Sequence, residues 1–256
     1  MTTLDLATRI GPYRAGQVLG RGRHATVYYA RREETGEGVA VKLAAQADLE
    51  REHRLLTACA HPNVVRVRAH GHGPRGQWLA MEWAEGGPLS LQTGAPVRTP
   101  FVHAWLQDAA MALAHLHRLG WVHRDVKSAN LLLRSDGRVV LADFGEAAPA
   151  GLTMPVPPNT VVGSPRYAAP EQSQGAAPTP AADVYGLGVV LYEWLTGRPP
   201  FTAETTAEAL AQHLCAPVPR LDAALAHWQP LLDRMLAKDP TRRLPDGQAV
   251  LSRKPS

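Results

Sequence analysis

Cysteine is nearly absent from the sequence: Cys59 and Cys215 are the only two among 256 residues. So few cysteines exclude a disulfide-rich secreted domain and fit a reducing compartment, and the chain is long enough to bury a core without cross-links. Apolar runs are also short, since none reaches the roughly 18 residues that a membrane-spanning helix needs. Residues 1–5 have neither the basic start nor the apolar stretch of a secretory signal peptide. We therefore expect a cytoplasmic protein without a membrane span.

A large charge of one sign is absent as well, because the net charge is only +4. The excess is uneven: residues 1–80 carry 12 Lys and Arg against 7 Asp and Glu, whereas residues 81–256 carry 15 against 16. Nucleic-acid binding is one explanation for a basic segment, but this segment has no basic run and no interleaved aromatic residues. We prefer a solvated arginine-rich face near a polyphosphate site, and we expect no nucleic-acid partner.

The residues that offer the most chemistry lie in 123–130, His-Arg-Asp-Val-Lys-Ser-Ala-Asn, and in 143–145, Asp-Phe-Gly. Asp125 could accept a proton from an attacking hydroxyl, and Lys127 could neutralise a phosphoryl group during its transfer. Asn130 and Asp143 offer hard oxygens of the kind that Mg²⁺ binds. H-R-D-x-K-x-x-N followed by D-F-G resembles the catalytic and metal-binding loops of the protein kinase family. A lone D-F-G would be a weak signal, but both motifs in this order and at this spacing are specific.

This resemblance implies a fold and a reaction. The fold would be α+β, a single two-lobed protein kinase domain over residues 1–256: an antiparallel sheet with one main helix at 10–82, and a larger, mainly helical lobe at 83–252. ATP would bind between the lobes with Mg²⁺, or with Mn²⁺, and its γ-phosphoryl group would pass to Ser and Thr hydroxyls of protein substrates, including this chain itself. Lys127 is the serine/threonine form of the catalytic loop, and the short Ala- and Arg-rich chain without inserts suggests a bacterial member.

A glycine-containing hairpin is expected near the N-terminus. Residues 13–19 and 28–30 have strand patterns, and the segment between them begins Gly20-Arg21-Gly22. A strand after the glycines, rather than a helix, argues against a dinucleotide-binding fold. In the kinase family this hairpin covers the nucleotide phosphates, although Ala25 here replaces the third glycine. Without the other motifs, an ordinary hairpin would be the better interpretation.

Residues 39–42, Val-Ala-Val-Lys, resemble the family's third strand with its phosphate-positioning lysine, Lys42. Apolar spacing predicts a helix over 46–58, where Glu52 fits the family's lysine partner better than Glu50 does. Taken singly, Lys42 and Glu52 would be ordinary surface residues. The resemblance implies these nucleotide contacts: Leu19, Gly20, Gly22, Ala25, Val27, Ala40, Lys42, Met81, Glu82, Trp83 and Leu132.

Further elements follow from periodicity and breaks. Strands are expected at 64–68 and 78–81, a hinge at 81–83, and a boundary at 85–88. The later elements are a helix from Thr99-Pro100 to Gly120, a hairpin of 131–133 with 139–141, an irregular loop at 146–162, a buried helix at 183–195, and helices at 204–214 and 223–237.

The family resemblance assigns roles in the second lobe. Asp125 would orient the substrate hydroxyl, and Lys127 would lie near the γ-phosphate. Ser164 would contact both of these residues. Asp183 would be buried and would accept backbone N–H groups from residues 123–124, because an unpaired buried carboxylate is costly. The resemblance also implies an ion pair between Glu171, in the A-P-E segment, and Arg243. It further implies an apolar stack of His123, Phe144, Leu56 and Val67.

Regulation and specificity are also suggested by the resemblance. Arg124 would bind a phosphate on Thr160, or on Thr153, after transient self-association, although Asp48 and residues 146–149 lack the basic companions of that site. Pro88 and Ala129 stand where kinases that select arginine carry acids, so no strong arginine preference is expected. Pro165 and Ala168 suggest an apolar pocket just after the acceptor.

Three alternative interpretations of the sequence are less favoured. A zinc site of Cys59, His61, His70 and His72 is less favoured than ordinary packing. A pseudokinase scaffold is disfavoured because every expected catalytic position is filled. A small-molecule kinase is disfavoured by the A-P-E segment and the helix from Asp183, which build a platform for protein substrates.

Overall fold

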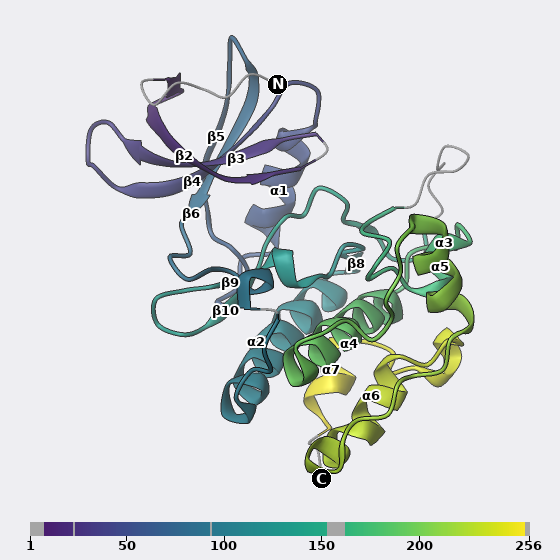
Figure 1. The fold of residues 1–256 in the computed structure, drawn as a ribbon. Helices are drawn as coiled ribbons and strands as arrows, with labels where there is room; N and C mark the ends of the chain where they lie inside the picture. The colour runs from purple at the N-terminus through teal and green to yellow at the C-terminus, as the bar shows by residue number, and fades with distance from the viewer. Residues whose placement is uncertain (1–7, 23, 93, 153–161, 254–256) are drawn as a thin grey trace. The chain divides into compact units, whose positions relative to one another are not determined.

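A computed structural model describes residues 8–22, 24–92, 94–152 and 162–253 of the chain (Figure 1). The chain divides into two compact units, Met1–Gly86 and Gly87–Ser256. The division falls inside the break that the sequence predicts at 85–88. No helix among the described residues combines the length and the apolar character that crossing a bilayer requires.

The first unit is an antiparallel sheet with one helix. The strand order is β1-β2-β3-β4-β6-β5. Alternate residues of these strands point into one core, in which Tyr13, Tyr28, Val41 and Trp78 are buried. The strands are β1 Arg9–Ile10, β2 Tyr13–Arg21, β3 Thr26–Arg32, β4 Gly38–Ala44, β5 Val67–Gly73 and β6 Gly76–Glu82.

The helix of this unit, α1, spans Leu49–Ala58. It begins three residues later than predicted because Asp48 caps it, accepting a hydrogen bond from the Arg51 N–H at 2.9 Å. Its buried face carries Leu49, Glu52, Leu55 and Leu56, at the spacing of one helix face.

The predicted strand at 64–68 is wrong, because β5 spans Val67–Gly73. Val64 and Val65 are buried, but the Val64 N–H donates to the His61 carbonyl in a turn. The strand itself is half-exposed and rich in Gly and His, and it is defined by its backbone pairing with β6. The apolar residues at 64–65 therefore led to a predicted strand where the chain forms a buried turn, and the paired strand lies after them.

The second unit is mainly helical (Figure 1). Its helices are α2 Thr99–Arg118, α3 Pro170–Ser173, α4 Pro180–Thr196, α5 Thr206–Cys215, α6 Gln229–Met235 and α7 Gly247–Leu251. Its strands form two small sheets: β10 Val139–Leu141, β9 Leu131–Leu133 and β7 Gly87–Pro88 in one, and β11 Ala148–Pro149 with β8 Trp121–Val122 in the other. Short 3₁₀ turns are η1 Leu89–Gln92, η2 Ser128–Asn130, η3 Ala223–Trp228 and η4 Pro240–Arg242.

Helix α4 lies at the centre of this unit, because nearly every residue from Ala181 to Leu195 is buried. The sequence predicted this burial from an apolar run without a polar face. The helix starts earlier than predicted, with Pro180 in its first turn, and ends at Gly197, whose φ of 73° is left-handed.

Two predictions for the second unit need correction. The loop predicted at 146–162 contains β11, which pairs with β8, and residues 153–161 lie outside the described part of the chain. The helix predicted at 223–237 divides into η3 and α6. Pro230 has no N–H to bond the Ala226 carbonyl in the α-helical way, and the Gln229 N–H takes that carbonyl in a 3₁₀ bond instead.

Candidate active site

In the first unit, a buried ion pair joins Lys42 on β4 to Glu52 on α1. The Lys42 Nζ lies 2.7 Å and 2.9 Å from the two carboxylate oxygens, and the residues are 9% and 1% exposed. Both charges would be costly to bury alone, so each requires the other. Glu50, the rejected alternative, is exposed and pairs with Arg54 instead. The predicted pairing of Lys42 with Glu52 is therefore present.

Strand register brings other predicted nucleotide contacts to the sheet face that carries Lys42. Val27 pairs with Lys42 across β3 and β4, and Ala40 pairs with Met81 across β4 and β6. Because side chains alternate along a strand, Val27, Ala40, Lys42 and Met81 lie on the face opposite the core residues Tyr28 and Val41. On this face of the sheet, Val27, Ala40 and Met81 thus place small and apolar side chains near Lys42.

The glycine hairpin is closed by a hydrogen bond from the Gly22 N–H to the Ala25 carbonyl at 2.8 Å. A Cβ at Gly20 would meet no atom within 4 Å, so the space beside this turn is open. Ala25 is buried at 6% exposure, so its methyl group packs inward. Leu19 is 38% exposed at the end of β2.

The side chains of Glu82, the last residue of β6, and of Trp83 both have partners within the first unit. A Glu82 carboxylate oxygen accepts the Arg66 N–H at 2.7 Å, and the Trp83 ring lies 4.6 Å from the Tyr29 ring, centroid to centroid. Any contact that these residues make with a nucleotide base would use the backbone.

In the second unit, Asp183 at the start of α4 organises the loop that begins at His123. Its carboxylate accepts the backbone N–H groups of His123 at 2.7 Å and Arg124 at 2.8 Å. Asp183 is 1% exposed, and Arg124 has a left-handed φ of 70°, so these bonds hold a conformation that an arginine rarely adopts. The predicted burial of Asp183 and its backbone partners are confirmed.

His117 on α2 is a contact that the sequence did not reveal. Its Nε2 lies 2.9 Å from an Asp183 carboxylate oxygen, and its Nδ1 accepts the Gly247 N–H at 3.2 Å. Since Nδ1 accepts, Nε2 carries the proton and donates to Asp183. His117 therefore connects the start of α7 with the residue that holds the loop.

Asp125, Lys127 and Ser164 meet beyond this anchor. The Lys127 Nζ donates to an Asp125 carboxylate oxygen at 2.6 Å and to the Ser164 hydroxyl at 2.8 Å. The Asn130 amide nitrogen donates to the same Asp125 oxygen at 3.1 Å. The other oxygen, Oδ1, is buried and has no partner among the described residues. An unpaired buried carboxylate oxygen is costly, so it is poised to accept a hydrogen bond from an incoming hydroxyl.

Asn130 and Asp143 offer oxygens of the kind that a hydrated divalent cation binds. Asn130 precedes β9 and Asp143 follows β10, and the hairpin brings them to one end, where the Ala142 N–H donates to the Asn130 carbonyl at 2.9 Å. The Asn130 amide nitrogen is used on Asp125, which leaves its amide oxygen as the group for a cation. No three His, Cys, Asp or Glu side chains converge on a metal position in the described part of the chain. Mg²⁺ needs no such cage, because it commonly binds one or two protein oxygens together with phosphates and water.

These arrangements agree with the comparison to known families, in which the protein kinase domain matches residues 13–252. The chain belongs to the protein kinase family. It is 39% identical to the serine/threonine-protein kinase PkaA of Streptomyces coelicolor over 90% of this chain and 47% of that relative. It is 36% identical to Pkn1 of Myxococcus xanthus over 93% of this chain and 37% of that relative. The chain thus spans less than half the length of these two kinases.

A eukaryotic relative matches a larger share of its own length. The Aurora/IPL1-related protein kinase 2 of Caenorhabditis elegans is 30% identical over 91% of this chain and 79% of that kinase. The bacterial relatives are consistent with the predicted bacterial type of kinase domain.

The segment after residue 162 packs tightly on the kinase catalytic loop. Gly163 has a φ of 84°, and a Cβ there would lie 2.4 Å from the Arg124 carbonyl oxygen. Further along, the Tyr167 hydroxyl donates to a Glu193 carboxylate oxygen at 2.8 Å, and the Ser128 hydroxyl donates to the other at 2.5 Å. Burial raises the pKa of Glu193. No motif or periodicity indicates this network of Ser128, Tyr167 and Glu193.

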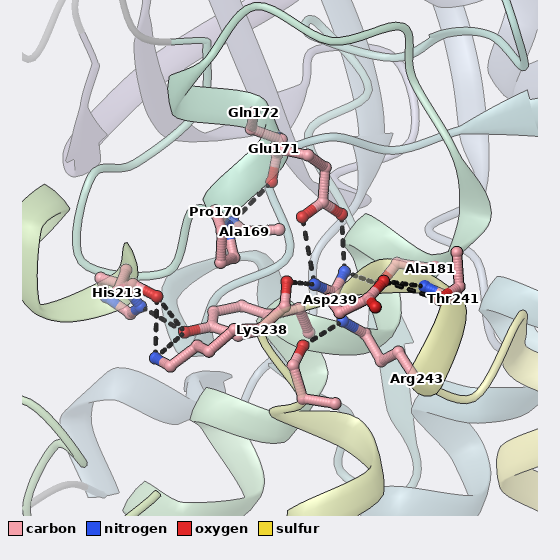
Figure 2. Close-up of polar contacts among 12 residues, drawn as sticks. Ala169, Pro170, Glu171, Gln172, Ala181, His213, Lys238, Asp239, Thr241 and Arg243 are labelled. Carbon is pink, nitrogen blue, oxygen red and sulfur yellow. Dashed lines mark hydrogen bonds and ion pairs between the residues drawn. The ribbon is translucent and has the colours of Figure 1, made fainter. Parts of the chain in front are cut away.

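The predicted ion pair of Glu171 and Arg243 is confirmed (Figure 2). Two guanidinium nitrogens of Arg243 lie 2.6 Å and 3.0 Å from the two Glu171 oxygens. The same guanidinium donates to the carbonyls of Ala181 and Lys238. This buried bidentate ion pair joins the A-P-E segment to Arg243, the residue that follows η4.

Two halves of the predicted apolar stack lie in different units. In the second unit, His123 and Phe144 meet edge to face at 5.0 Å between centroids, and a ring nitrogen of His123 bonds the Ala142 carbonyl. In the first unit, Leu56 is buried and Val67 is half-buried. That the four form one stack stays a prediction. Leu132, the nucleotide contact expected from the second unit, lies on β9 opposite Pro88.

Two predicted phosphate acceptors and the histidines and cysteine of the less favoured zinc set are the last residues singled out by the sequence. Thr153 and Thr160 lie outside the described residues. Cys59, from the less favoured zinc set, is fully buried, and burial raises its pKa to about 11. His61 accepts the Asn63 N–H at 3.1 Å. His70 stacks on His53.

Proposed function

We propose that this chain is an active serine/threonine protein kinase domain. The main observation is that Lys127 bonds both Asp125 and Ser164, while the buried Asp125 Oδ1 has no hydrogen-bond partner among the described residues. The Lys127 ammonium group and the Asn130 amide both donate to Asp125 Oδ2, which holds the carboxylate in place to orient a substrate hydroxyl through Oδ1. Phosphoryl transfer asks for positioning and charge neutralisation, which this arrangement supplies.

The other residues take supporting roles in this proposal. ATP binds the glycine hairpin and the sheet face that carries Lys42, with Glu52 holding the lysine amine for the phosphates. Asn130 and Asp143 hold Mg²⁺ or Mn²⁺, which neutralises phosphate charge when bound. Lys127 neutralises the transferring group. Protein substrates present a Ser or Thr hydroxyl to Asp125.

The proposed setting is the cytoplasm, where both cysteines would stay reduced, as they are in the structure. Phosphorylation of Thr160 by a second copy of the chain, with Arg124 as the phosphate ligand, stays a prediction from the sequence.

The test is incorporation of radiolabelled phosphate from ATP into the chain and into a general protein substrate, with Mg²⁺ or Mn²⁺. We expect Asp125→Asn and Lys42→Met each to lower the rate by about 10²-fold or more, because each removes a positioned charge. Asp136→Asn, in the exposed turn between β9 and β10, is the matched control and should keep wild-type activity. EDTA should abolish incorporation.

A wild-type chain that binds ATP yet transfers no phosphate would contradict the proposal and favour a pseudokinase scaffold. Transfer by Asp125→Asn at the wild-type rate would contradict the role of Asp125.

A further inference from the structure

A row of polar side chains, two of them buried and one half-buried, leads to the backbone of residues 164–167. It consists of Lys238, Tyr185 on α4 and His213 on α5, and it ends at the backbone carbonyl of Arg166. Tyr185 and His213 are 0% and 2% exposed. None of these three residues belongs to the proposed catalytic or nucleotide-binding set.

The hydrogen bonds in this row all run in one direction. A carbonyl oxygen only accepts, so the His213 Nε2 must carry the proton that bonds Arg166 at 2.9 Å. The His213 Nδ1 then accepts from the Tyr185 hydroxyl at 2.9 Å. The Tyr185 oxygen in turn accepts from the Lys238 Nζ at 3.2 Å. Each group therefore fixes the hydrogen position of the next one.

Lys238 also secures the end of α5. Its Nζ donates to the His213 carbonyl at 2.7 Å and to the Gln212 carbonyl at 3.3 Å, and Figure 2 shows this side chain reaching His213. The ammonium group lies 4.2 Å from the centroid of the Phe201 ring, a favourable cation–π contact. His213 is thus held both through its imidazole ring, which bonds Tyr185, and through its backbone carbonyl, which accepts from Lys238.

Burial lowers the pKa of His213 to about 4. The ring is therefore neutral at ordinary working pH, and the acceptor at Arg166 selects one tautomer. A neutral, buried and singly oriented imidazole has the properties of a fixed support rather than of an acid or a base.

The supported carbonyl lies between two residues that are already fixed to the catalytic loop. The Ser164 hydroxyl accepts from the Lys127 Nζ at 2.8 Å, and the Tyr167 hydroxyl lies 2.9 Å from the Ser128 hydroxyl. His213 fixes the backbone between them, while the Arg166 side chain is exposed. The segment is therefore held at three points, and the Lys127 ammonium group joins its first residue, Ser164, to Asp125.

We propose that His213 is a positioning residue for the protein substrate: by holding the Arg166 carbonyl, it shapes the surface on which the residues beside the acceptor Ser or Thr lie. This inference rests on the proposed kinase function. Within the described part of the second unit, His213 bonds Tyr185, Lys238 and the Arg166 carbonyl rather than Asp125, so its loss should weaken protein-substrate binding and spare ATP binding.

The test uses His213→Leu, which removes both hydrogen bonds, and His213→Gln, whose amide keeps one donor and one acceptor. Tyr185→Phe removes only the hydroxyl that donates to the His213 Nδ1 and accepts from Lys238. His227→Leu, an exposed histidine in the same unit, is the matched control. The KM for a peptide substrate is measured at saturating ATP, and the KM for ATP at saturating peptide. Amide hydrogen exchange is measured over residues 163–168 without substrate.

For His213→Leu we expect the peptide KM to rise about 5- to 10-fold, the cost of one buried hydrogen bond, with the KM for ATP within twofold of wild type. Tyr185→Phe should shift the peptide KM in the same direction, His213→Gln should recover most of the loss, and His227→Leu should match wild type. Amide hydrogen exchange over residues 163–168 should be faster in His213→Leu than in the wild type, while exchange in the rest of the chain should be unchanged.

An unchanged peptide KM, an equal rise in both KM values, or a His213→Gln variant as impaired as His213→Leu would overturn the inference. If His213→Leu does not fold, Tyr185→Phe and His213→Gln decide. If the wild type transfers no phosphate, the proposed function fails separately, and the exchange rates alone decide whether His213 holds the segment.

Discussion

Asp183 shows what a single side chain does in this kinase domain. Its carboxylate accepts two successive backbone N–H groups and the His117 Nε2 proton, so both oxygens are satisfied without a formal cation. Asp183→Asn would remove the charge and keep the shape of the side chain, and it would place the amide NH₂ group against one of these three donors. A buried donor facing a donor costs more than the lost hydrogen bond itself.

We therefore expect Asp183→Asn to lower the free energy of unfolding by about 1–3 kcal/mol and to reduce kcat, because the backbone at Arg124 loses its partner. Urea unfolding and steady-state kinetics measure the two effects. Asp136→Asn, exposed in the same unit, serves as the control. Equal stability of the two variants would show that the Asp183 charge is dispensable.

Among single residues, the sequence predicted those that belong to ordered motifs. Lys42 with Glu52 and Glu171 with Arg243 follow from motif order and spacing, because each pair of motifs occurs once in the chain. His117, Glu193 and His213 could not be predicted in this way. His213 and Arg166 are 47 positions apart, and no periodicity or motif connects them.

At the scale of elements, the helices were easier to predict than the short strands. Helices α2 and α4 have long apolar patterns and clear proline or glycine ends. Strand β11 has two residues and exists only because β8 lies beside it. Strand β5 likewise depends on pairing with β6 rather than on its own composition.

The reactivity of the two cysteines reports on the ends of helices α1 and α5, where they lie. Cys59 caps α1, where its N–H bonds the Leu55 carbonyl, and it is fully buried with its pKa raised to about 11 by burial. Cys215 is the last residue of α5 and is exposed. Thiolates, not thiols, react, so a thiol reagent at pH 8 should modify Cys215 quickly and Cys59 only slowly.

Mass spectrometry of the native chain after brief labelling should show one modification, located at Cys215, and two after unfolding in urea. Fast labelling of Cys59 in the native chain would mean that α1, the helix that carries Glu52, opens readily.

At the scale of the whole molecule, the buried His213 predicts part of the dependence of stability on pH. Its pKa is lowered from 6.5 in the unfolded chain to about 4 in the folded one. Between these values the unfolded chain binds more protons, so stability falls as the pH falls through this window. Carboxylates add their own dependence, and a comparison with a variant separates the two.

We expect the thermal unfolding midpoint of the wild type to exceed that of His213→Gln at pH 7.5, and the difference to shrink steadily toward pH 4. Glutamine does not titrate, so only the wild type loses this contribution. Calorimetry at a series of pH values measures the difference. A gap that stays constant would show that His213 is protonated in the folded chain as readily as in the unfolded one.

The contact of Gly163 with the Arg124 carbonyl has a genetic consequence. Every amino acid other than glycine carries a Cβ, and a Cβ at this position would lie 2.4 Å from that oxygen, in a backbone conformation with a φ of 84°. No missense codon, however conservative the exchange, avoids the overlap. Among natural variants of this gene, silent changes at codon 163 should therefore be the ones that persist.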